Sequence, residues 1–215
     1  MIVPERMAAF IDSFDTGNTE FLDMIEKEAK ENDVPVIRKP MQRLLKFILA
    51  YHKPECVLEV GTATGFSAML MKEYAPASCK ITTIEKYDKR IKEAKNNFKR
   101  AGVENDIQLL EGDATDILKE LAGPYDMIFM DAAKGQYINF YEDVFRLLKK
   151  GGLLVSDNVL QEGDIMESRF ILERRNRTIH SRMREYLYTL THDERIETVI
   201  LPVGDGVTLS IKKED

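Results

Sequence analysis

The sequence predicts an α/β fold, with a mostly parallel sheet of seven strands, helices on both faces and further helices ahead of it. From Cys56 onward, short apolar runs alternate with helical segments, and this alternation is typical of a doubly wound parallel sheet. The last two apolar runs are instead joined by the short turn 202–206, and a connection of that length makes an antiparallel pair. One antiparallel strand is therefore expected near an edge of the sheet.

The expected elements follow in chain order. The chain begins with three helical segments, at 4–14, 19–32 and 40–51. Asn18 or Thr19 can cap the second helix; Pro35 marks the break after it, and residues 34–37 form an extended apolar connector. Strands are expected at 57–60, 81–85, 107–111, 127–130, 153–156, 197–201 and 207–211. Helices between and after them are expected at 66–74, 89–100, 115–121, 137–149 and 168–190.

Composition narrows the class of protein. The 215 residues suffice for one domain with a full core, and 44% hydrophobic with 32% charged residues is typical of a soluble globular chain. The amino terminus has no apolar signal-peptide core, and no apolar run is long enough to span a membrane, so a cytoplasmic protein is expected. Cys56 and Cys79 are expected to be small buried hydrophobes rather than a disulfide.

Charge is distributed unevenly along the chain. The net charge of −6 argues weakly against nucleic acid as a partner. Between Arg169 and Arg184, however, six arginines stand against one acid, Glu173. These arginines can bind RNA phosphates, and the alternatives are a solvated helix face or a subunit contact.

Polar side chains follow two of the expected strands at the point where each strand ends. Asp131 comes directly after one buried run, and Asp157 and Asn158 follow the next. Open α/β sheets bind ligands at the carboxyl ends of their strands. The three residues offer hard oxygen ligands without thiolate or imidazole, which suits Mg²⁺.

A glycine-containing turn, Glu59-Val-Gly-Thr-Ala-Thr-Gly65, closes the first expected strand. A dinucleotide fingerprint that starts at Gly61 needs glycine at two positions that hold Ala63 and Phe66, which argues against NAD. The turn also lacks the Gly-Lys-Ser/Thr of a phosphate-binding loop. It therefore predicts a nucleotide-like ligand that lies across the strand end without phosphate recognition.

Four polar residues are candidates for binding that ligand. Glu85 ends the second strand and can accept both hydroxyls of a ribose. Asp113 can meet the edge of an adenine, or it can cap the next helix. Glu59 needs a partner that a cofactor ammonium group would supply. Ser67 is either a helix cap or a ligand for a carboxylate.

Five motifs in this order resemble the metal-dependent class I S-adenosylmethionine O-methyltransferases, which include the catechol and caffeoyl-coenzyme A enzymes. They are Glu59-Val-Gly-Thr-Ala-Thr-Gly65, Glu85, Gly112-Asp-Ala114, Asp131-Ala-Ala-Lys-Gly-Gln-Tyr137 and Asp157-Asn-Val159. The resemblance runs from about Val34 to the carboxyl terminus. It implies a Rossmann-like methyltransferase fold over 1–215, with a helical cap at 1–52, a catalytic core at 53–215 and a homodimeric assembly.

The resemblance also implies a cofactor, a metal and roles for particular residues. The cofactor would be S-adenosylmethionine and the metal Mg²⁺, with Mn²⁺ and Ca²⁺ left open. Cofactor contacts are implied for Ile37, Glu59, Gly61, Ser67, Glu85, Asp113, Ala114 and Asp131. The metal ligands would be Asp131, Asp157 and Asn158. Lys134 would act with Asp131 in catalysis by accepting the substrate proton; otherwise it is a solvated lysine at a helix start.

Within the family, the chain is most similar to bacterial tRNA 5-hydroxyuridine methyltransferases. The likeness lies in Val34-Pro-Val36, the run Asp131-Ala-Ala-Lys-Gly-Gln-Tyr137, the arginine-rich segment and the ending Leu201-Pro-Val-Gly-Asp-Gly206. This implies methylation of wobble 5-hydroxyuridine to 5-methoxyuridine in tRNA, with Arg174, Arg175 and Arg177 on the RNA. The alternative is a small catechol-type substrate, although the catechol enzymes carry His-Trp where this chain has Ala132-Ala133. A non-catalytic binding protein is a third alternative, which the intact set of polar residues disfavours.

Overall fold

The structure, a computed structural model, describes residues 3–168 and 170–213. Three helices come first: α1 (Glu5–Asp12), α2 (Glu20–Glu31) and α3 (Lys39–His52). The strands are β1 (Cys56–Val60), β2 (Lys80–Glu85), β3 (Ile107–Glu111), β4 (Tyr125–Met130), β5 (Leu148–Ser156), β6 (Ile196–Leu201) and β7 (Val207–Lys212). The remaining helices are α4 (Phe66–Tyr74), α5 (Asp88–Ala101), α6 (Ala114–Glu120), α7 (Tyr137–Leu147) and α8 (Arg177–His192), with 3₁₀ turns η1 (Lys134–Gln136) and η2 (Gln161–Met166).

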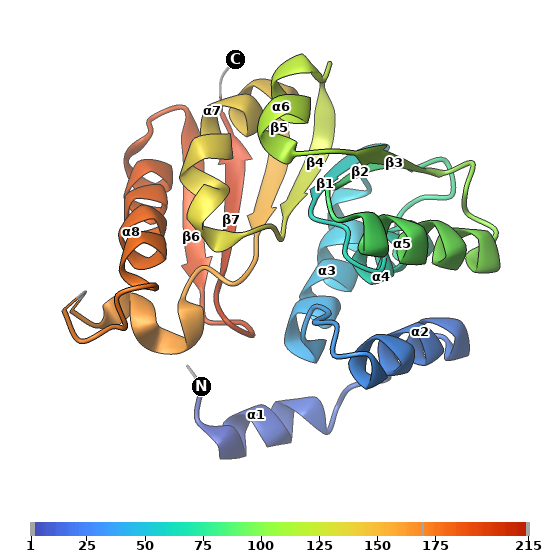
Figure 1. The fold of residues 1–215 in the computed structure, drawn as a ribbon, viewed down its shortest axis with the longest axis horizontal. Helices are drawn as coiled ribbons and strands as arrows, with labels where there is room; N and C mark the ends of the chain where they lie inside the picture. Colours follow the sequence, from blue (N-terminus) through green and yellow to red (C-terminus); the bar gives the residue numbers. More distant parts are fainter. Residues whose placement is uncertain (1–2, 169, 214–215) are drawn as a thin grey trace.

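The strands form one seven-stranded sheet in the order β3-β2-β1-β4-β5-β7-β6, which Figure 1 shows with its flanking helices. The strands from β3 to β5 are parallel to one another, and β7 runs antiparallel to both β5 and β6. The predicted fold class is therefore confirmed, including the single antiparallel strand next to an edge. The prediction of one domain over the whole chain stays a prediction.

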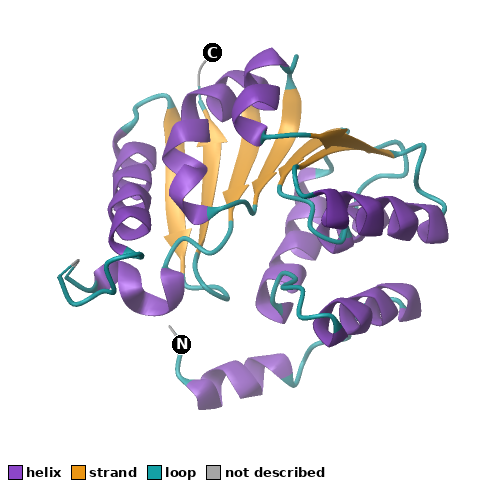
Figure 2. Cartoon of the chain, viewed as in Figure 1, coloured by secondary structure: helices purple, strands orange, loops and turns teal. Residues whose placement is uncertain are grey.

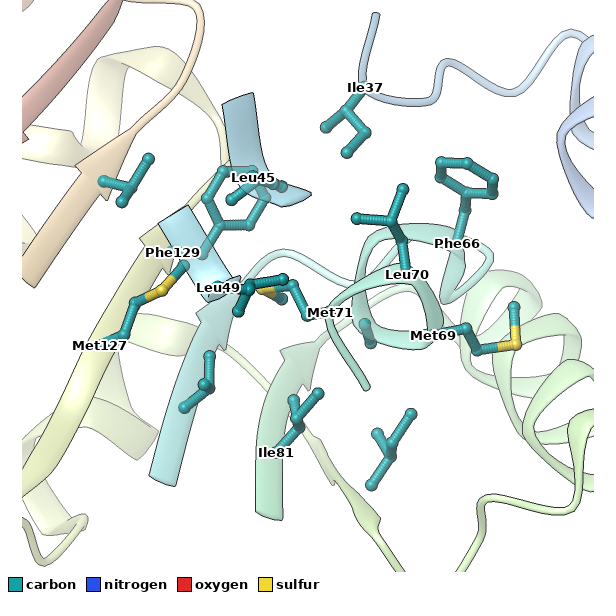
Figure 3. Packing of buried hydrophobic residues seen from close by; sticks show 14 of the residues in the cluster. Ile37, Leu45, Leu49, Phe66, Met69, Leu70, Met71, Ile81, Met127 and Phe129 are labelled. Atoms are coloured by element: carbon teal, nitrogen blue, oxygen red, sulfur yellow. The ribbon is translucent and has the colours of Figure 1, made fainter. Parts of the chain in front are cut away.

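Alternate residues of the central strands point to opposite faces of the sheet, and both faces are apolar. Met127 and Phe129 of β4 pack with α3 and α4, whereas Ile128 and Met130 pack with α6, α7 and α8. Figure 3 shows the first of these layers, with Phe129 among the labelled side chains, and Figure 2 shows helices flanking the sheet. A sheet covered on both faces needs strands that are apolar throughout, and this is the pattern from which the strands were predicted.

The helix boundaries agree with the prediction to within two residues, except for the start of the last helix. The helix expected to start at residue 168 begins at Arg177, and the described residues before it form turns. The Arg177 guanidinium donates to the carbonyls of Phe170 and Leu172, which satisfies backbone acceptors without a helix. Arg169 lies outside the described residues. The helix expected to reach residue 149 ends at Leu147, because Leu148 already pairs with Tyr125 of β4.

Helix α1 lies apart from the sheet in Figure 1 and buries no side chain within the described part of the chain. Phe10 and Phe14 are 63% and 70% exposed and stack edge to face on each other.

The homodimer implied by the family resemblance stays a prediction. Among the residues that the structure describes, no helix is long and apolar enough to cross a membrane.

Candidate active site

The carboxyl ends of β1, β2, β3 and β4 surround a cavity of about 260 Å³. Every residue implied to contact the cofactor lines this cavity except Glu59: Ile37, Gly61, Ser67, Glu85, Asp113, Ala114 and Asp131. Residues 35–37 of the extended connector form part of the same wall. The parallel topology explains the convergence, since it places all these strand ends at one edge.

The turn after β1 approaches β4 so closely that only glycine fits at its start. Gly61 has φ +103°, and a Cβ there would lie 2.3 Å from the carbonyl oxygen of Asp131. This contact places the turn against the end of β4. A ligand in the cavity therefore meets main chain from the 61–64 turn and the side chain of Asp131 at the same point.

Glu85 and Asp113 stand at the ends of β2 and β3, and both have local partners. The Glu85 carboxylate accepts backbone N–H groups from Ala63, Lys86 and Tyr87, each at 2.9 Å, and so holds the 61–64 turn. Asp113 caps α6 by accepting the Thr115 N–H at 2.9 Å. The capping alternative for Asp113 is confirmed, and its side chain still lines the cavity. Ser67 is no helix cap, because its hydroxyl donates to Glu59.

Glu59 lies beneath the cavity rather than on its wall. Its side chain is fully buried and accepts hydrogen bonds from the hydroxyls of Ser67 and, at 2.5 Å, Thr83. The pKa of Glu59 is raised to about 8, because the effect of burial outweighs the two hydrogen bonds, which lower the pKa. The expected contact with a cofactor ammonium stays a prediction, and in the described structure Ser67 stands on the cavity wall next to it.

Asp131, Asp157 and Asn158 come together where β4 and β5 end. The Asn158 amide donates to Asp131 at 3.3 Å, and the Asn158 N–H donates to the Asp157 carboxylate at 2.7 Å. The buried Tyr137 hydroxyl lies 3.0 Å from the carbonyls of Met130 and Asp157 and so ties the two strand ends together. The predicted set is thus one cluster on adjacent strands.

The electrostatics of this cluster favour a cation. Burial, together with the neighbouring carboxylates of Asp131 and Asp205, raises the pKa of Asp157 to about 7. Burial also raises the pKa of Asp131, against the effects of Asn158 and Lys134. A divalent cation would relieve this repulsion, and two carboxylates with an amide are oxygen donors of the kind that Mg²⁺ prefers. The described residues hold no group of three His, Cys, Asp or Glu side chains suited to a metal, so the amide is needed as the third donor.

A second cavity, of about 560 Å³, adjoins the first, and Asp131 lines both. Lys134 and Asn158 also line it, as do three residues that the sequence did not single out: Arg38, Glu162 and Asp205. Arg38 and Glu162 form an ion pair across the cavity, between the connector and η2. The Lys134 ammonium lies 3.3 Å from the buried Asp205 carboxylate. The Gly-Asp-Gly turn between two expected strands is the feature of the sequence that could have identified Asp205.

The predicted RNA-binding arginines have different environments. Arg174 and Arg175 are exposed, and Arg175 pairs with Glu173 at 2.7 Å. Arg177 is half-buried and holds the carbonyls of its own loop, as described above. None of the three lines the second cavity, but their neighbours Leu172 and Asn176 do. The segment therefore lies at the rim of this cavity.

Comparisons with known proteins bear on the family and the fold of the chain. The family model described as O-methyltransferase matches residues 13–213. The caffeoyl-CoA O-methyltransferase of Stellaria longipes is 34% identical over 175 residues, covering 77% of this chain and 71% of that protein. A catechol O-methyltransferase of Niastella koreensis is 34% identical over 129 residues, and the match spans 58% of either chain. The SAH-bound methyltransferase PaMTH1 of Podospora anserina superposes with a TM-score of 0.87 at 27% identity, covering 100% and 99% of the two chains.

Proposed function

The chain belongs to the S-adenosylmethionine-dependent O-methyltransferase family of the catechol and caffeoyl-CoA enzymes, and we propose that it methylates one of two vicinal oxygens on its substrate in a metal-dependent reaction. One observation carries this proposal: Asp131 lies in the wall shared by two cavities. The methyl donor occupies the first cavity and the acceptor the second. Their reacting atoms then meet beside Asp131.

The residues of the chain have separate tasks in this reaction. Residues 35–37 and the 61–64 turn enclose the donor and keep water from the methyl group. A divalent cation held by Asp131, Asp157 and Asn158 would lower the pKa of the hydroxyl to be methylated. Lys134, on the wall of the acceptor cavity, takes the proton of that hydroxyl. The resulting oxyanion attacks the methyl group in line with the departing sulfur.

A small catechol-type molecule is the acceptor that the relatives support. Their names specify catechol and caffeoyl-CoA as substrates of those proteins. The two adjacent oxygens of a catechol suit a site that holds both at once. The acceptor cavity, at about 560 Å³, has room for a ring of that size.

A 5-hydroxyuridine in tRNA is the second candidate acceptor, because its 5-hydroxyl and O4 are also vicinal. The exposed pair Arg174 and Arg175 at the rim of the acceptor cavity favours it. Their side chains are available for phosphates, since the Arg175–Glu173 ion pair is 80% and 67% exposed and therefore weak. The Arg177 guanidinium donates to carbonyls of its own loop, so Arg177 is the least suitable RNA ligand of the three.

Purified protein with S-adenosylmethionine and Mg²⁺ is offered catechol and, separately, tRNA that carries 5-hydroxyuridine. Methyl transfer to either acceptor that is lost in chelator and restored by Mg²⁺ supports the proposed function. Transfer that is unaffected by chelator, or transfer to neither acceptor, contradicts it.

Charge reversal then separates the two acceptors. If the acceptor is tRNA, Arg174→Glu with Arg175→Glu reduces tRNA methylation while catechol turnover, where present, is unchanged. The matched control is Lys53→Glu with Lys150→Glu, which makes the same charge change on exposed residues at the opposite edge of the sheet. The affinity of wild type for tRNA falls with salt at a log–log slope of about −0.7 per phosphate contacted. Catechol turnover without tRNA turnover assigns the small-molecule acceptor.

A further inference from the structure

Asp205 lies in the turn between β6 and β7, and its carboxylate connects two parts of the acceptor cavity. The side chain is 3% exposed. Its Oδ2 atom lies 3.3 Å from the Lys134 ammonium, and its Oδ1 atom accepts the N–H of Glu162. One buried carboxylate thus joins the lysine after β4 to the segment that follows Asn158.

The same turn holds that segment through main-chain contacts. The Leu160 N–H donates to the Asp205 carbonyl and the Val159 N–H to the Gly206 carbonyl, both at 3.0 Å. A Cβ at Gly206 would lie 2.2 Å from the Leu160 side chain, so the two segments are closer than any larger residue permits. The 159–162 segment is therefore fixed by side-chain and backbone bonds from one turn.

The segment needs such support because its backbone is unfavourable. Asn158, Gln161 and Glu162 have φ values of +61°, +50° and +56°, a region that residues with a Cβ rarely adopt. Conformations of this kind persist only where the surroundings impose them, and they concentrate at active sites. The contacts from Asp205 and Gly206 are those surroundings, and Asn158 is one of the candidate metal ligands.

We propose that Asp205 is a positioning residue that holds the Lys134 side chain at the acceptor cavity and keeps the 158–162 segment in the conformation that turns Asn158 toward Asp131. The inference rests on the proposed roles of Lys134 and Asn158. Asp205 lines the acceptor cavity but not the donor cavity. Its replacement therefore acts on proton transfer and metal binding while S-adenosylmethionine binding is preserved.

Two substitutions separate the two tasks of the carboxylate. Asp205→Asn keeps an oxygen for the Glu162 N–H and loses the ion pair with Lys134, so kcat falls about tenfold or more at unchanged KM. Asp205→Ala loses both contacts, so Mn²⁺ affinity also falls and the Leu160 and Glu162 amides exchange their hydrogens faster. Mn²⁺ binding alone and hydrogen exchange are measured on the complete chain without substrate.

A double-mutant cycle tests whether Asp205 acts through Lys134. Lys134→Met with Asp205→Asn has the kcat of Lys134→Met alone, within about twofold, because the ion pair is already absent. Losses that multiply contradict the proposal, as does an Asp205→Asn enzyme with wild-type kcat.

Asp126 supplies the matched control, since it too is a carboxylate that accepts backbone N–H groups and pairs with a lysine, but at the opposite edge of the sheet. Asp126→Asn lowers the melting temperature and leaves kcat and Mn²⁺ affinity unchanged. If Asp205→Asn behaves in the same way, its role is structural and the proposal fails. If wild type methylates neither acceptor, the proposed function fails. The role of Asp205 is tested separately, because Mn²⁺ affinity and amide exchange need no methyl transfer. If both are unchanged in Asp205→Ala, this inference is overturned.

Discussion

Asp126 and Asp131 stand at the two ends of strand β4 and have opposite environments. Asp126 accepts the N–H groups of Glu55 and Cys56, both at 2.8 Å, and pairs with Lys149. Burial would raise the pKa of Asp126, but Lys149 and the two backbone donors outweigh it and leave the pKa below its usual value. Asp131 has the Asn158 amide at 3.3 Å, and its pKa lies above the usual value.

The difference shows how one strand separates stability from function. At the amino edge, where the amino ends of the parallel strands lie, the Asp126 carboxylate has partners within the chain and reinforces the junction of β1, β4 and β5. At the carboxyl edge, Asp131 and Asp157 lie close together where their mutual repulsion is not fully compensated. Groups held in this way destabilise the free protein and favour a ligand of opposite charge. The carboxyl edge is therefore adapted to binding.

Loss of either carboxylate at the carboxyl edge is expected to have the largest effect. Asp131→Ala or Asp157→Ala reduces methyl transfer by about a hundredfold to a thousandfold, because each removes a charged oxygen donor from a set of three. Asn158→Ala is milder, since it removes no charge. Initial rates at saturating S-adenosylmethionine measure the effect, and thermal unfolding shows that the fold persists. Near-normal rates would remove the basis for a metal at this edge.

Glu85 is expected to matter next, through the donor cavity. Glu85→Ala removes a charge-assisted acceptor and frees the 61–64 turn, so affinity for S-adenosylmethionine falls by about 1.5–3 kcal/mol. Calorimetric titration measures it. The control is Glu111→Ala at the end of neighbouring β3, whose exposed ion pair with Lys95 contributes little. Equal affinities in the two variants would make Glu85 a strand terminus only.

At the amino edge, the expected change is in stability alone. Asp126→Asn lowers the free energy of unfolding at pH 7 by roughly 1–3 kcal/mol, because two backbone donors and Lys149 lose their anionic partner. The folded-state pKa of Asp126 is depressed, so this stabilisation is present above the unfolded-state value and is lost as pH falls through the folded-state value. Urea unfolding at several pH values measures it. A loss of methyl transfer in the folded variant would contradict the division between the edges.

Glu59 provides the most specific test. Its folded-state pKa of about 8 lies above the unfolded value of 4.5, so its contribution to stability is complete below pH 4.5 and declines up to about pH 8. Glu59→Gln keeps the hydrogen-bonding shape and removes this decline. The variant therefore gains stability relative to wild type between pH 5 and about 8, as pH-dependent urea unfolding measures. Parallel pH curves for the two proteins would show that Glu59 is ionised in its buried position.

Particular residues show how far sequence reasoning reached into the site. The strand ends after residues 60, 85, 111, 130 and 156 were readable from apolar runs, and parallel topology then brings their side chains to one edge. Asp205 was not recognised, since it lies in the turn between β6 and β7 rather than at the end of a parallel strand, and it reaches Lys134 only because β7 lies next to β5. The start of α8 was predicted too early. The Arg177 side chain donates to the Phe170 and Leu172 carbonyls, which helical N–H groups would otherwise satisfy.

The sequence by itself determined the alternation of strands and helices, the antiparallel last strand, and which carboxylates end the parallel strands. These features depend on local apolar patterns and on topology rules that hold for any such sheet. Tertiary structure alone decided which carboxylates are satisfied. Asp126 gained a lysine and two amides from distant segments, whereas Asp131 and Asp157 were placed against each other. The energy of a buried charge depends on neighbours that are remote in sequence, so the chemistry of this site exists only once the sheet has assembled.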